Sequence, residues 1–256
     1  MSLDTLVAAN ALSGLSPQNA AVFLDFDGVL VDLAPTPDDV LVANALISLL
    51  AALETETEGA CAIVTGRPVE DLRRHLPLVP HAVIGSHGAE GYLPGAPAFR
   101  HPLVGSDTIA RMHDRAARAE ELDGVMVERK PTGVALHYRG APDHAGAVHD
   151  VANALVAEFA GFVMLPAKAA VEIRPSDIGK DIAVARAMAL PVFAGRTPVY
   201  FGDDTTDEPA LAWVADHGGV AVKVGPGDSV ARHRLSGPVE VQAVLADWLK
   251  NGWRWE

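Results

Sequence analysis

The sequence predicts an α/β protein: a Rossmann-like, doubly wound parallel sheet interrupted by a smaller inserted α+β domain. Two observations carry this prediction. Near both ends of the chain, short apolar runs alternate with helical patterns, as in buried parallel strands joined by helices. Between them the order becomes helix, two strands, helix, two strands, which is typical of an antiparallel sheet backed by two helices. We therefore expect a core formed by residues 1–101 and 176–256, with an insert, called the cap, at 102–175.

The first part of the core contains three predicted strands and two helices. The strands are the apolar runs at 21–25, 61–64 and 81–85. A helix follows the first strand, because apolar residues recur there at helical spacing. Its stripe consists of Leu41, Leu46, Leu49, Leu50 and Leu53. Pro68 opens the second helix, where its missing N–H has no partner to lose.

The cap and the second part of the core continue these patterns. In the cap we expect helices at 106–122 and 145–159, and strands at 125–130, 134–139, 162–165 and 169–175. In the second part of the core we expect helices at 181–190, from 207 and at 239–250, and strands at 198–204 and 219–225.

Composition excludes several classes of protein. The 256 residues carry a formal net charge of −13, which repels nucleic acids and anionic membranes. A single cysteine allows no internal disulfide and no thiolate zinc cage. No apolar run reaches the roughly 18–20 residues of a bilayer-spanning helix. The amino terminus lacks the pattern of a signal peptide. We therefore expect a cytoplasmic protein that acts on a small molecule, and nothing in the sequence demands more than a monomer.

Two aspartates follow the first predicted strand. Asp25 and Asp27 stand two residues apart in FLDFDGVLVD. Reactive groups of open α/β sheets gather at the carboxyl ends of strands. There, one carboxylate can attack or bind metal while the other exchanges a proton. Gly28 allows a sharp turn after them. A strand-to-loop turn with solvated aspartates explains the same residues, so this motif alone leaves both interpretations open.

Two further segments offer groups suited to phosphate. Thr65, Gly66 and Arg67 follow the second strand with a hydroxyl, a backbone N–H and a guanidinium. Small polar residues also commonly cap the helix that follows, which is the alternative interpretation. Lys180 opens a predicted helix, where the helix dipole disfavours a cation. It fits there if it faces the aspartates and a phosphate; otherwise it is an exposed surface lysine.

An acidic cluster follows a later strand in FGDDTTDE. Asp203, Asp204, Asp207 and Glu208 repel one another unless water or a cation screens them. Carboxylate oxygens suit Mg²⁺ better than zinc. An acidic helix amino terminus, stabilised by the helix dipole, is the alternative, above all for Asp207 and Glu208.

The segments that contain Asp25, Thr65, Lys180 and Asp203 follow one another in this order along the chain. Together they resemble the four motifs of the haloacid dehalogenase superfamily of phosphotransferases. The resemblance implies a nucleophile that forms an aspartyl-phosphate, a general acid and base, and two phosphate ligands that balance charge. In the same order these are Asp25, Asp27, Thr65 and Lys180. The implied cofactor is Mg²⁺, with candidate ligands Asp25, Asp27 through its backbone carbonyl, Asp203 and Asp204.

One face of the predicted cap sheet is polar. Strand alternation turns the valines and other apolar residues to one side and leaves a polar set on the other. This set is Glu128, Lys130, His137, Arg139, Glu172 and Arg174. A plain solvent-facing sheet has the same pattern. However, mixed donors and acceptors also suit a hydroxyl-rich sugar, whereas an apolar ligand would leave them unpaired.

The Glu-x-Lys, His-Tyr-Arg and Val-Glu-x-Arg-Pro segments of the cap resemble those of trehalose-6-phosphate phosphatases. The GSHGAE segment resembles the loop that precedes the cap in that family. The resemblance adds Ser86, His87 and Gly88 to Gly66, Arg67 and the polar set as candidate substrate-binding residues.

The function implied by this resemblance is hydrolysis of trehalose 6-phosphate to trehalose and phosphate, the last step of trehalose biosynthesis. Two alternatives stay open. One is the same chemistry on another sugar phosphate, such as sucrose phosphate or mannosyl-phosphoglycerate. The other is a catalytically silent sugar-phosphate sensor, against which the intact Asp25, Asp27, Lys180 and Asp203 argue.

Overall fold

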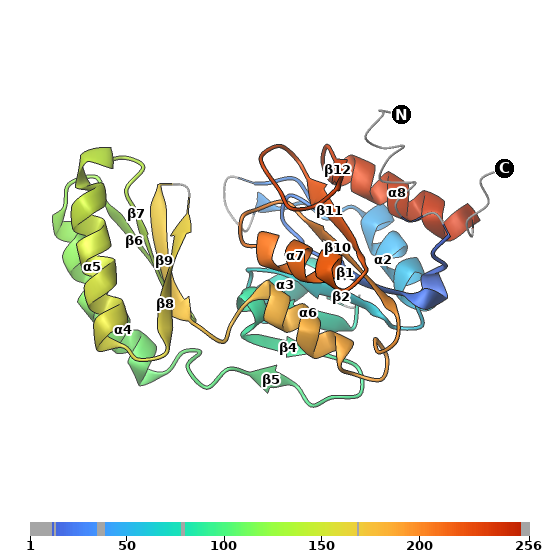
Figure 1. Cartoon of the computed structure of the whole chain (residues 1–256), viewed down its shortest axis with the longest axis horizontal. Helices are drawn as coiled ribbons and strands as arrows, with labels where there is room; N and C mark the ends of the chain where they lie inside the picture. The colour runs from blue at the N-terminus through green and yellow to red at the C-terminus, as the bar shows by residue number, and fades with distance from the viewer. Residues whose placement is uncertain (1–11, 13, 35–38, 78–79, 168, 252–256) are drawn as a thin grey trace. The chain divides into compact units, whose positions relative to one another are not determined.

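The computed structural model describes residues 12, 14–34, 39–77, 80–167 and 169–251. These residues form two compact units. The described residues up to Phe99 and from Gly179 onward form the core, and Arg100–Ile178 form the cap. Each unit has its own sheet, so the predicted α/β class with a separate antiparallel cap sheet is confirmed (Figure 1). Among the described residues, no helix is long and apolar enough to cross a membrane.

The core sheet has eight strands in the order β12-β11-β10-β1-β2-β3-β4-β5. Neighbours from β12 to β3 are parallel, and β4 runs antiparallel to β3. The parallel strands are β1 (Ala20–Leu24), β2 (Cys61–Val64), β3 (Ala82–Gly85), β10 (Thr197–Gly202), β11 (Val220–Val224) and β12 (His233–Leu235). The remaining two are β4 (Glu90–Tyr92) and β5 (Phe99–Arg100).

Helices cover both faces of this sheet. They are α2 (Asn44–Glu56), α3 (Val69–His75), α6 (Lys180–Met188), α7 (Glu208–Asp216) and α8 (Pro238–Asn251). Successive residues of β1 belong to different apolar clusters, because side chains alternate along a strand. Val22 and Leu24 pack with α2, α3 and α8, whereas Ala21 and Phe23 pack with α6 and α7. The sheet is therefore packed between two apolar layers, one on each face. This packing holds the strands, and with them the residues at their carboxyl ends, in place.

The cap is a four-stranded antiparallel sheet backed by two helices. Its strands lie in the order β6-β7-β9-β8. They are β6 (Met126–Lys130), β7 (Gly133–His137), β8 (Phe162–Ala167) and β9 (Ala170–Pro175). The helices are α4 (Asp107–Ala116) and α5 (Ala145–Glu158). Val134 and Leu136 of β7 pack against these helices in one apolar cluster. The opposite face carries Glu128, Lys130, His137, Glu172 and Arg174 together with the apolar Met126, Ala135, Val163 and Leu165.

The structure corrects three details of the prediction. Leu41 precedes α2, which begins only at Asn44, and is 90% exposed. The strand expected at 134–139 ends at His137, so Arg139 lies in an exposed turn. The helix expected at 106–122 divides into α4 and a short 3-10 helix, Ala117–Glu121. Short 3-10 helices also occupy Pro17–Asn19, Ser86–Gly88 and Pro142–His144.

Candidate active site

Four adjacent strands of the core end in polar residues at one edge of the sheet. Asp25 follows β1, Thr65 follows β2, Ser86 follows β3 and Asp203 follows β10. These strands are neighbours in the order β10-β1-β2-β3 and run parallel, so their carboxyl ends meet. This is the edge at which open α/β sheets bind ligands.

Asp25 is held by the backbone and by a lysine. Its Oδ1 accepts a hydrogen bond from Phe26 N at 2.7 Å, and its Oδ2 lies 2.8 Å from Lys180 Nζ. Burial raises the pKa of Asp25 well above its usual value, and the charges of Asp207 and Asp203 add to this, while Lys180 opposes it. The site therefore needs positive charge to keep this carboxyl ionised.

Lys180 and Asp207 form a buried ion pair beside Asp25. Lys180 Nζ lies 2.7 Å from Asp207 Oδ1, which also accepts a 2.6 Å hydrogen bond from Tyr200. Burial acts to lower the pKa of Lys180, but the two carboxylates outweigh it, so the pKa is raised. Lys180 lowers the pKa of Asp207 against the opposing effect of burial. Lys180 is therefore charged and bridges two carboxylates.

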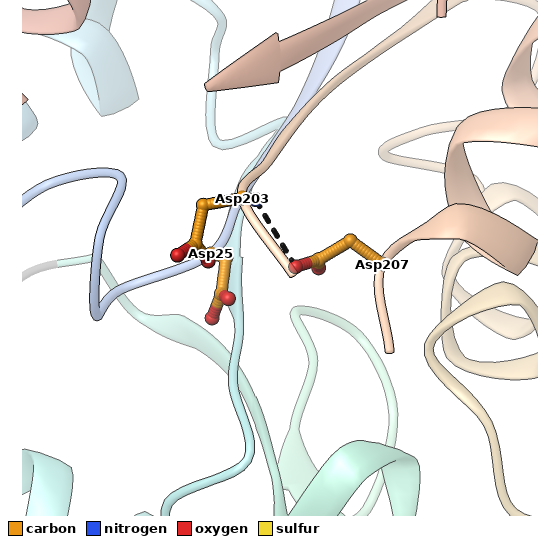
Figure 2. A group of neighbouring side chains, drawn as sticks. All are labelled: Asp25, Asp203 and Asp207. Carbon is orange, nitrogen blue, oxygen red and sulfur yellow. Dashed lines mark hydrogen bonds between the residues drawn. The ribbon is translucent and has the colours of Figure 1, made fainter. Parts of the chain in front are cut away.

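Asp207 also organises the loop that carries Asp203. Its Oδ2 accepts hydrogen bonds from the N–H groups of Asp203 at 3.2 Å and Asp204 at 3.1 Å. Figure 2 shows the bond to Asp203 and the approach of both side chains to Asp25. Lys223 Nζ donates to the backbone carbonyl of Asp203. The two carboxylate oxygens of Asp207 thus have four donors, from Lys180, Tyr200 and the backbone of Asp203 and Asp204, which fix its position.

Asp25, Asp203 and Asp207 form an acidic group. One carboxylate oxygen of each lies within 4.8 Å of the others. Burial, followed by the charge of Asp207, raises the pKa of Asp203 to about 6. Among the described residues, no donor hydrogen-bonds to the Asp203 carboxylate, which lies where a Cβ on Gly28 would collide with it. Asp25 and Asp203 thus leave negative charge that a hard cation would balance.

Asp27 points to a different partner. Its carboxylate accepts two hydrogen bonds from Arg67, Nε–Oδ2 at 2.7 Å and Nη2–Oδ1 at 2.8 Å. The hydrogen bonds from Arg67 to Asp27 raise the pKa of the guanidinium further above its usual value, and the ion pair with Asp71 adds to this. Asp27 is thus oriented, while its side chain is not part of the acidic group.

The loops after β2 and β3 pack closely on each other. Thr65 is buried, and its Oγ1 accepts a hydrogen bond from Arg67 N at 3.1 Å. A Cβ on Gly66 would lie 2.6 Å from the His87 ring. Ser86 is buried and its Oγ donates to Glu90 at 3.2 Å. Gly88 adopts a positive φ of 109°, where a Cβ would also press on a backbone carbonyl. The glycines therefore permit this close approach.

The polar face of the cap sheet carries one ion pair and one histidine–glutamate contact. Lys130 Nζ lies 3.2 Å from Glu172 Oε2, and His137 Nε2 lies 2.9 Å from Glu128 Oε2. Both glutamates flank Ala135 in the strand register, so they share a face. Arg174 of β9 shares the face of Glu172, two residues before it, and donates to the carbonyl of Ile178, whereas Arg139 lies in an exposed turn beyond β7.

Sequence reasoning left two residues of the core site out. Asp207 was weighed as an ordinary helix amino terminus, yet it is buried and links Lys180, Tyr200 and the Asp203 loop. Its signal was the position four residues after Asp203. Tyr200 lies within a strand and gave no signal of its own. Asp204, in contrast, is exposed, and its carboxylate accepts a 2.6 Å hydrogen bond from Thr205 N, away from the acidic group.

Comparison with known proteins points to one family. The family model described as trehalose-phosphatase matches residues 23–242. The chain is 34% identical to a trehalose-6-phosphate phosphatase of Escherichia coli (strain K12), covering 88% of this chain and 85% of the relative. It is 36% identical to a probable trehalose-phosphate phosphatase of Sinorhizobium fredii (strain NBRC 101917 / NGR234), covering 87% and 85%.

Solved structures share the fold. A trehalose-6-phosphate phosphatase related protein is 25% identical, with a TM-score of 0.71 over 90% of this chain and 97% of the other. The C-terminal domain of C. albicans trehalose-6-phosphate phosphatase has a TM-score of 0.75 at 21% identity, covering 97% of both chains. A phosphatase of the haloalkanoate (HAD) superfamily from Bacteroides thetaiotaomicron has a TM-score of 0.60 at 17% identity, covering 91% and 96%. The family match over most of the chain is decisive: this protein belongs to the trehalose-phosphatase family.

Proposed function

We propose that the protein is a magnesium-dependent phosphatase that hydrolyses trehalose 6-phosphate to trehalose and inorganic phosphate. Its family and the names of its relatives support the substrate. The observation that carries the reaction type is the buried Asp25 carboxylate beside Lys180 at the carboxyl end of β1. A nucleophile at a sheet edge with an adjacent fixed cation is suited to attack on a phosphate dianion.

In the first step, an oxygen of Asp25 attacks phosphorus. The bond from phosphorus to the sugar oxygen breaks as the new bond to Asp25 forms. The departing sugar oxygen takes a proton from the Asp27 carboxyl, so trehalose leaves as a neutral alcohol. Lys180 balances the charge of Asp25 and of the phosphoryl oxygens, and the Thr65 hydroxyl donates to one of those oxygens.

In the second step, water attacks the phosphorus of the aspartyl-phosphate. Asp27, now a carboxylate, takes the proton of that water. The bond between phosphorus and Asp25 breaks, which restores the Asp25 carboxylate and releases phosphate. Two reactions of moderate difficulty thereby replace one difficult displacement.

The acidic group fits Mg²⁺. Asp25 and Asp203, with the backbone carbonyl of Asp27, would hold the ion; it would supply positive charge that offsets the phosphate dianion. Asp207 is less suited as a ligand, because donors occupy both of its oxygens. We assign Asp207 to fixing Lys180 and the Asp203 loop instead, and Asp204 stays a candidate ligand only through its position in the sequence.

We assign sugar recognition to the polar residues of the cap sheet, and Ser86, His87 and Gly88 of the core stay candidate substrate-binding residues through their position in the sequence. Glu128, Lys130, His137 and Glu172 offer donors and acceptors to hydroxyl groups. A matched pair of cap variants tests this. Glu172→Gln removes the partner of Lys130, whereas Glu120→Gln removes an exposed partner of Arg129. We expect Glu172→Gln to raise KM by roughly tenfold and Glu120→Gln to leave it unchanged. Equal effects would overturn the assignment.

Phosphate release from a panel of esters tests the function. The panel holds trehalose 6-phosphate, glucose 6-phosphate, sucrose 6-phosphate and mannosyl-phosphoglycerate, each with Mg²⁺ and with a chelator. We expect kcat/KM for the trehalose ester to exceed the others by about 100-fold or more, and to vanish with chelator. Preference for another ester would favour the same chemistry on that sugar. No release from any ester would favour a silent sensor.

A further inference from the structure

Arg67 and Asp27 meet in a two-pronged ion pair. Both oxygens of the Asp27 carboxylate are engaged, by Nε at 2.7 Å and by Nη2 at 2.8 Å. The Arg67 side chain is only 9% exposed and that of Asp27 is 29% exposed. Such parallel hydrogen bonds fix the plane of a carboxylate as well as its position. The side-chain direction of Asp27 is therefore set by Arg67.

Arg67 is itself held from several sides. Its Nη1 lies 3.0 Å from Asp71 Oδ2, on the first turn of α3. The guanidinium lies over the Phe26 ring, 5.4 Å from its centroid. The backbone N–H of Arg67 donates to Thr65 Oγ1, and its carbonyl accepts from Ser86 N. The guanidinium thus directs Nε, Nη1 and Nη2 to carboxylates, and its position is fixed independently of any ligand.

We propose that Arg67 is a positioning residue for Asp27 and not a ligand of the phosphate. This inference rests on the proposed function, in which Asp27 gives a proton to the departing sugar oxygen and later takes one from water. A protonated carboxyl keeps one oxygen that only accepts. Arg67 can hold that oxygen while the other, bearing the proton, faces the leaving group. The same two-pronged pair then stabilises the carboxylate when the proton has been transferred.

Two substrates with different leaving groups distinguish a role of Arg67 in positioning Asp27 from a role in binding the phosphate. A sugar oxygen leaves as a strongly basic alkoxide unless it is protonated, so its departure depends on Asp27. The p-nitrophenolate of p-nitrophenyl phosphate is weakly basic and leaves without a proton. For both esters, kcat/KM reports only the steps up to release of the alcohol or phenol. Loss of a phosphate ligand lowers both values alike, whereas misplacement of Asp27 lowers only the first.

The experiment compares wild type, Arg67→Ala, Arg67→Lys and Asp27→Asn on the two esters with Mg²⁺. We expect Arg67→Ala to lose about 100-fold or more in kcat/KM for trehalose 6-phosphate and about threefold or less for p-nitrophenyl phosphate. Asp27→Asn should share this signature. Arg67→Lys keeps the charge but cannot form both bonds, so it should show the same selectivity with a smaller loss.

Arg74→Ala is the matched control. Arg74 lies on α3 with Asp71, pairs with it at 3.5 Å, and its side chain is 66% exposed. Its removal should leave both values unchanged. If Arg67→Ala fails to fold, Arg67→Lys and Asp71→Asn, which loosens the guanidinium at Nη1, provide the same comparison.

Equal losses on both esters in the Arg67 variants would overturn the inference and make Arg67 a phosphate ligand. The proposed function is tested separately, by wild-type turnover of trehalose 6-phosphate. If wild type prefers another sugar phosphate, the comparison is made with that ester. If it hydrolyses no sugar phosphate, the inference falls together with the proposed function.

Discussion

The phenol oxygen of Tyr200 lies 2.6 Å from Oδ1 of Asp207, the same oxygen that pairs with Lys180. Both side chains are buried, so the hydrogen bond cannot be replaced by water. Tyr200 belongs to β10, an interior strand of the core sheet, and Asp207 immediately precedes α7. The hydrogen bond therefore ties the charge network of the site to a buried strand of the core sheet.

Tyr200→Phe should weaken the hydrogen-bond network around Asp207 without leaving a large cavity in the core. The ring is retained, while a hydrogen bond to a charged acceptor is lost, which lowers the free energy of unfolding by about 1–2 kcal/mol. We expect kcat to fall by severalfold, because Asp207 keeps its other donors. Urea denaturation and phosphate release measure the two effects. Tyr92→Phe, at an exposed tyrosine, is the control and should change neither. Unchanged stability in Tyr200→Phe would contradict this account.

Lys180→Met should be far more damaging. The substitution leaves Asp25 and Asp207 buried without their shared cation. Breaking a buried pair in this way costs about 3–5 kcal/mol of unfolding free energy. Activity should fall by a factor of about 100–1000 or more, because the charge that balances the nucleophile is lost. Lys250→Met, at an exposed lysine, should match wild type. Near-normal activity of Lys180→Met would remove Lys180 from the site.

Alanine substitutions at two glycines with similar backbone angles distinguish the effect of backbone strain from that of a steric clash with Asp203. Gly28 and Gly95 have φ values of 75° and 76°. A Cβ at Gly28 would strike the Asp203 carboxylate, whereas at Gly95 it would meet nothing within 4 Å. Both alanine variants should lose about 1–2 kcal/mol of unfolding free energy to the left-handed backbone. Only Gly28→Ala should also lose activity and Mg²⁺ affinity. An active Gly28→Ala would show that Asp203 has room to move.

Stability should depend on pH and Mg²⁺ together. Burial and the charge of Asp207 raise the pKa of Asp203 to about 6, so the folded protein binds this proton more tightly than the unfolded chain. Without metal, Asp203 therefore lowers the free energy of unfolding as pH rises from about 4 to about 6. Bound Mg²⁺ needs the carboxylate and relieves its repulsion. The rise in Tm on adding Mg²⁺ should thus be larger at pH 7.5 than at pH 5.

Thermal melts at both pH values, with Mg²⁺ and with chelator, measure this difference. Asp203→Asn is the control, because it removes one of the two titrating carboxylates of the site and should reduce the pH dependence of the Mg²⁺ effect. An equal rise in Tm at the two pH values in wild type would show that Asp203 does not bind the ion.

The sequence was informative wherever burial leaves a periodic pattern. The wholly apolar segments AVFL and CAIV predicted central parallel strands, since both faces of such a sheet are covered. The polar residues that follow them, Asp25 and Thr65, could therefore be placed at one sheet edge. In the cap, the alternation of Val171 and Ile173 with Glu172 and Arg174 predicted which face would be buried.

Other features have no such signal. Strands β4 and β12 span three residues each, too short for a period to appear. Asp207 has two physical explanations at a helix start, dipole and ion pair, and only the fold brings Lys180 to it. The sequence places Arg67 next to Thr65 and Gly66, but spacing alone does not reveal that Asp27, 40 residues away, pairs with it.

The most direct test of the central claim is phosphate release from trehalose 6-phosphate by Asp25→Asn, beside wild type, at saturating Mg²⁺. The substitution keeps the shape of the side chain but removes the nucleophile, while the fold is checked by its thermal melt. We predict brisk release by wild type and a loss of about 1000-fold or more in kcat for the variant. Release by Asp25→Asn close to the wild-type rate would show that the phosphoryl group does not pass through Asp25, and would contradict the account.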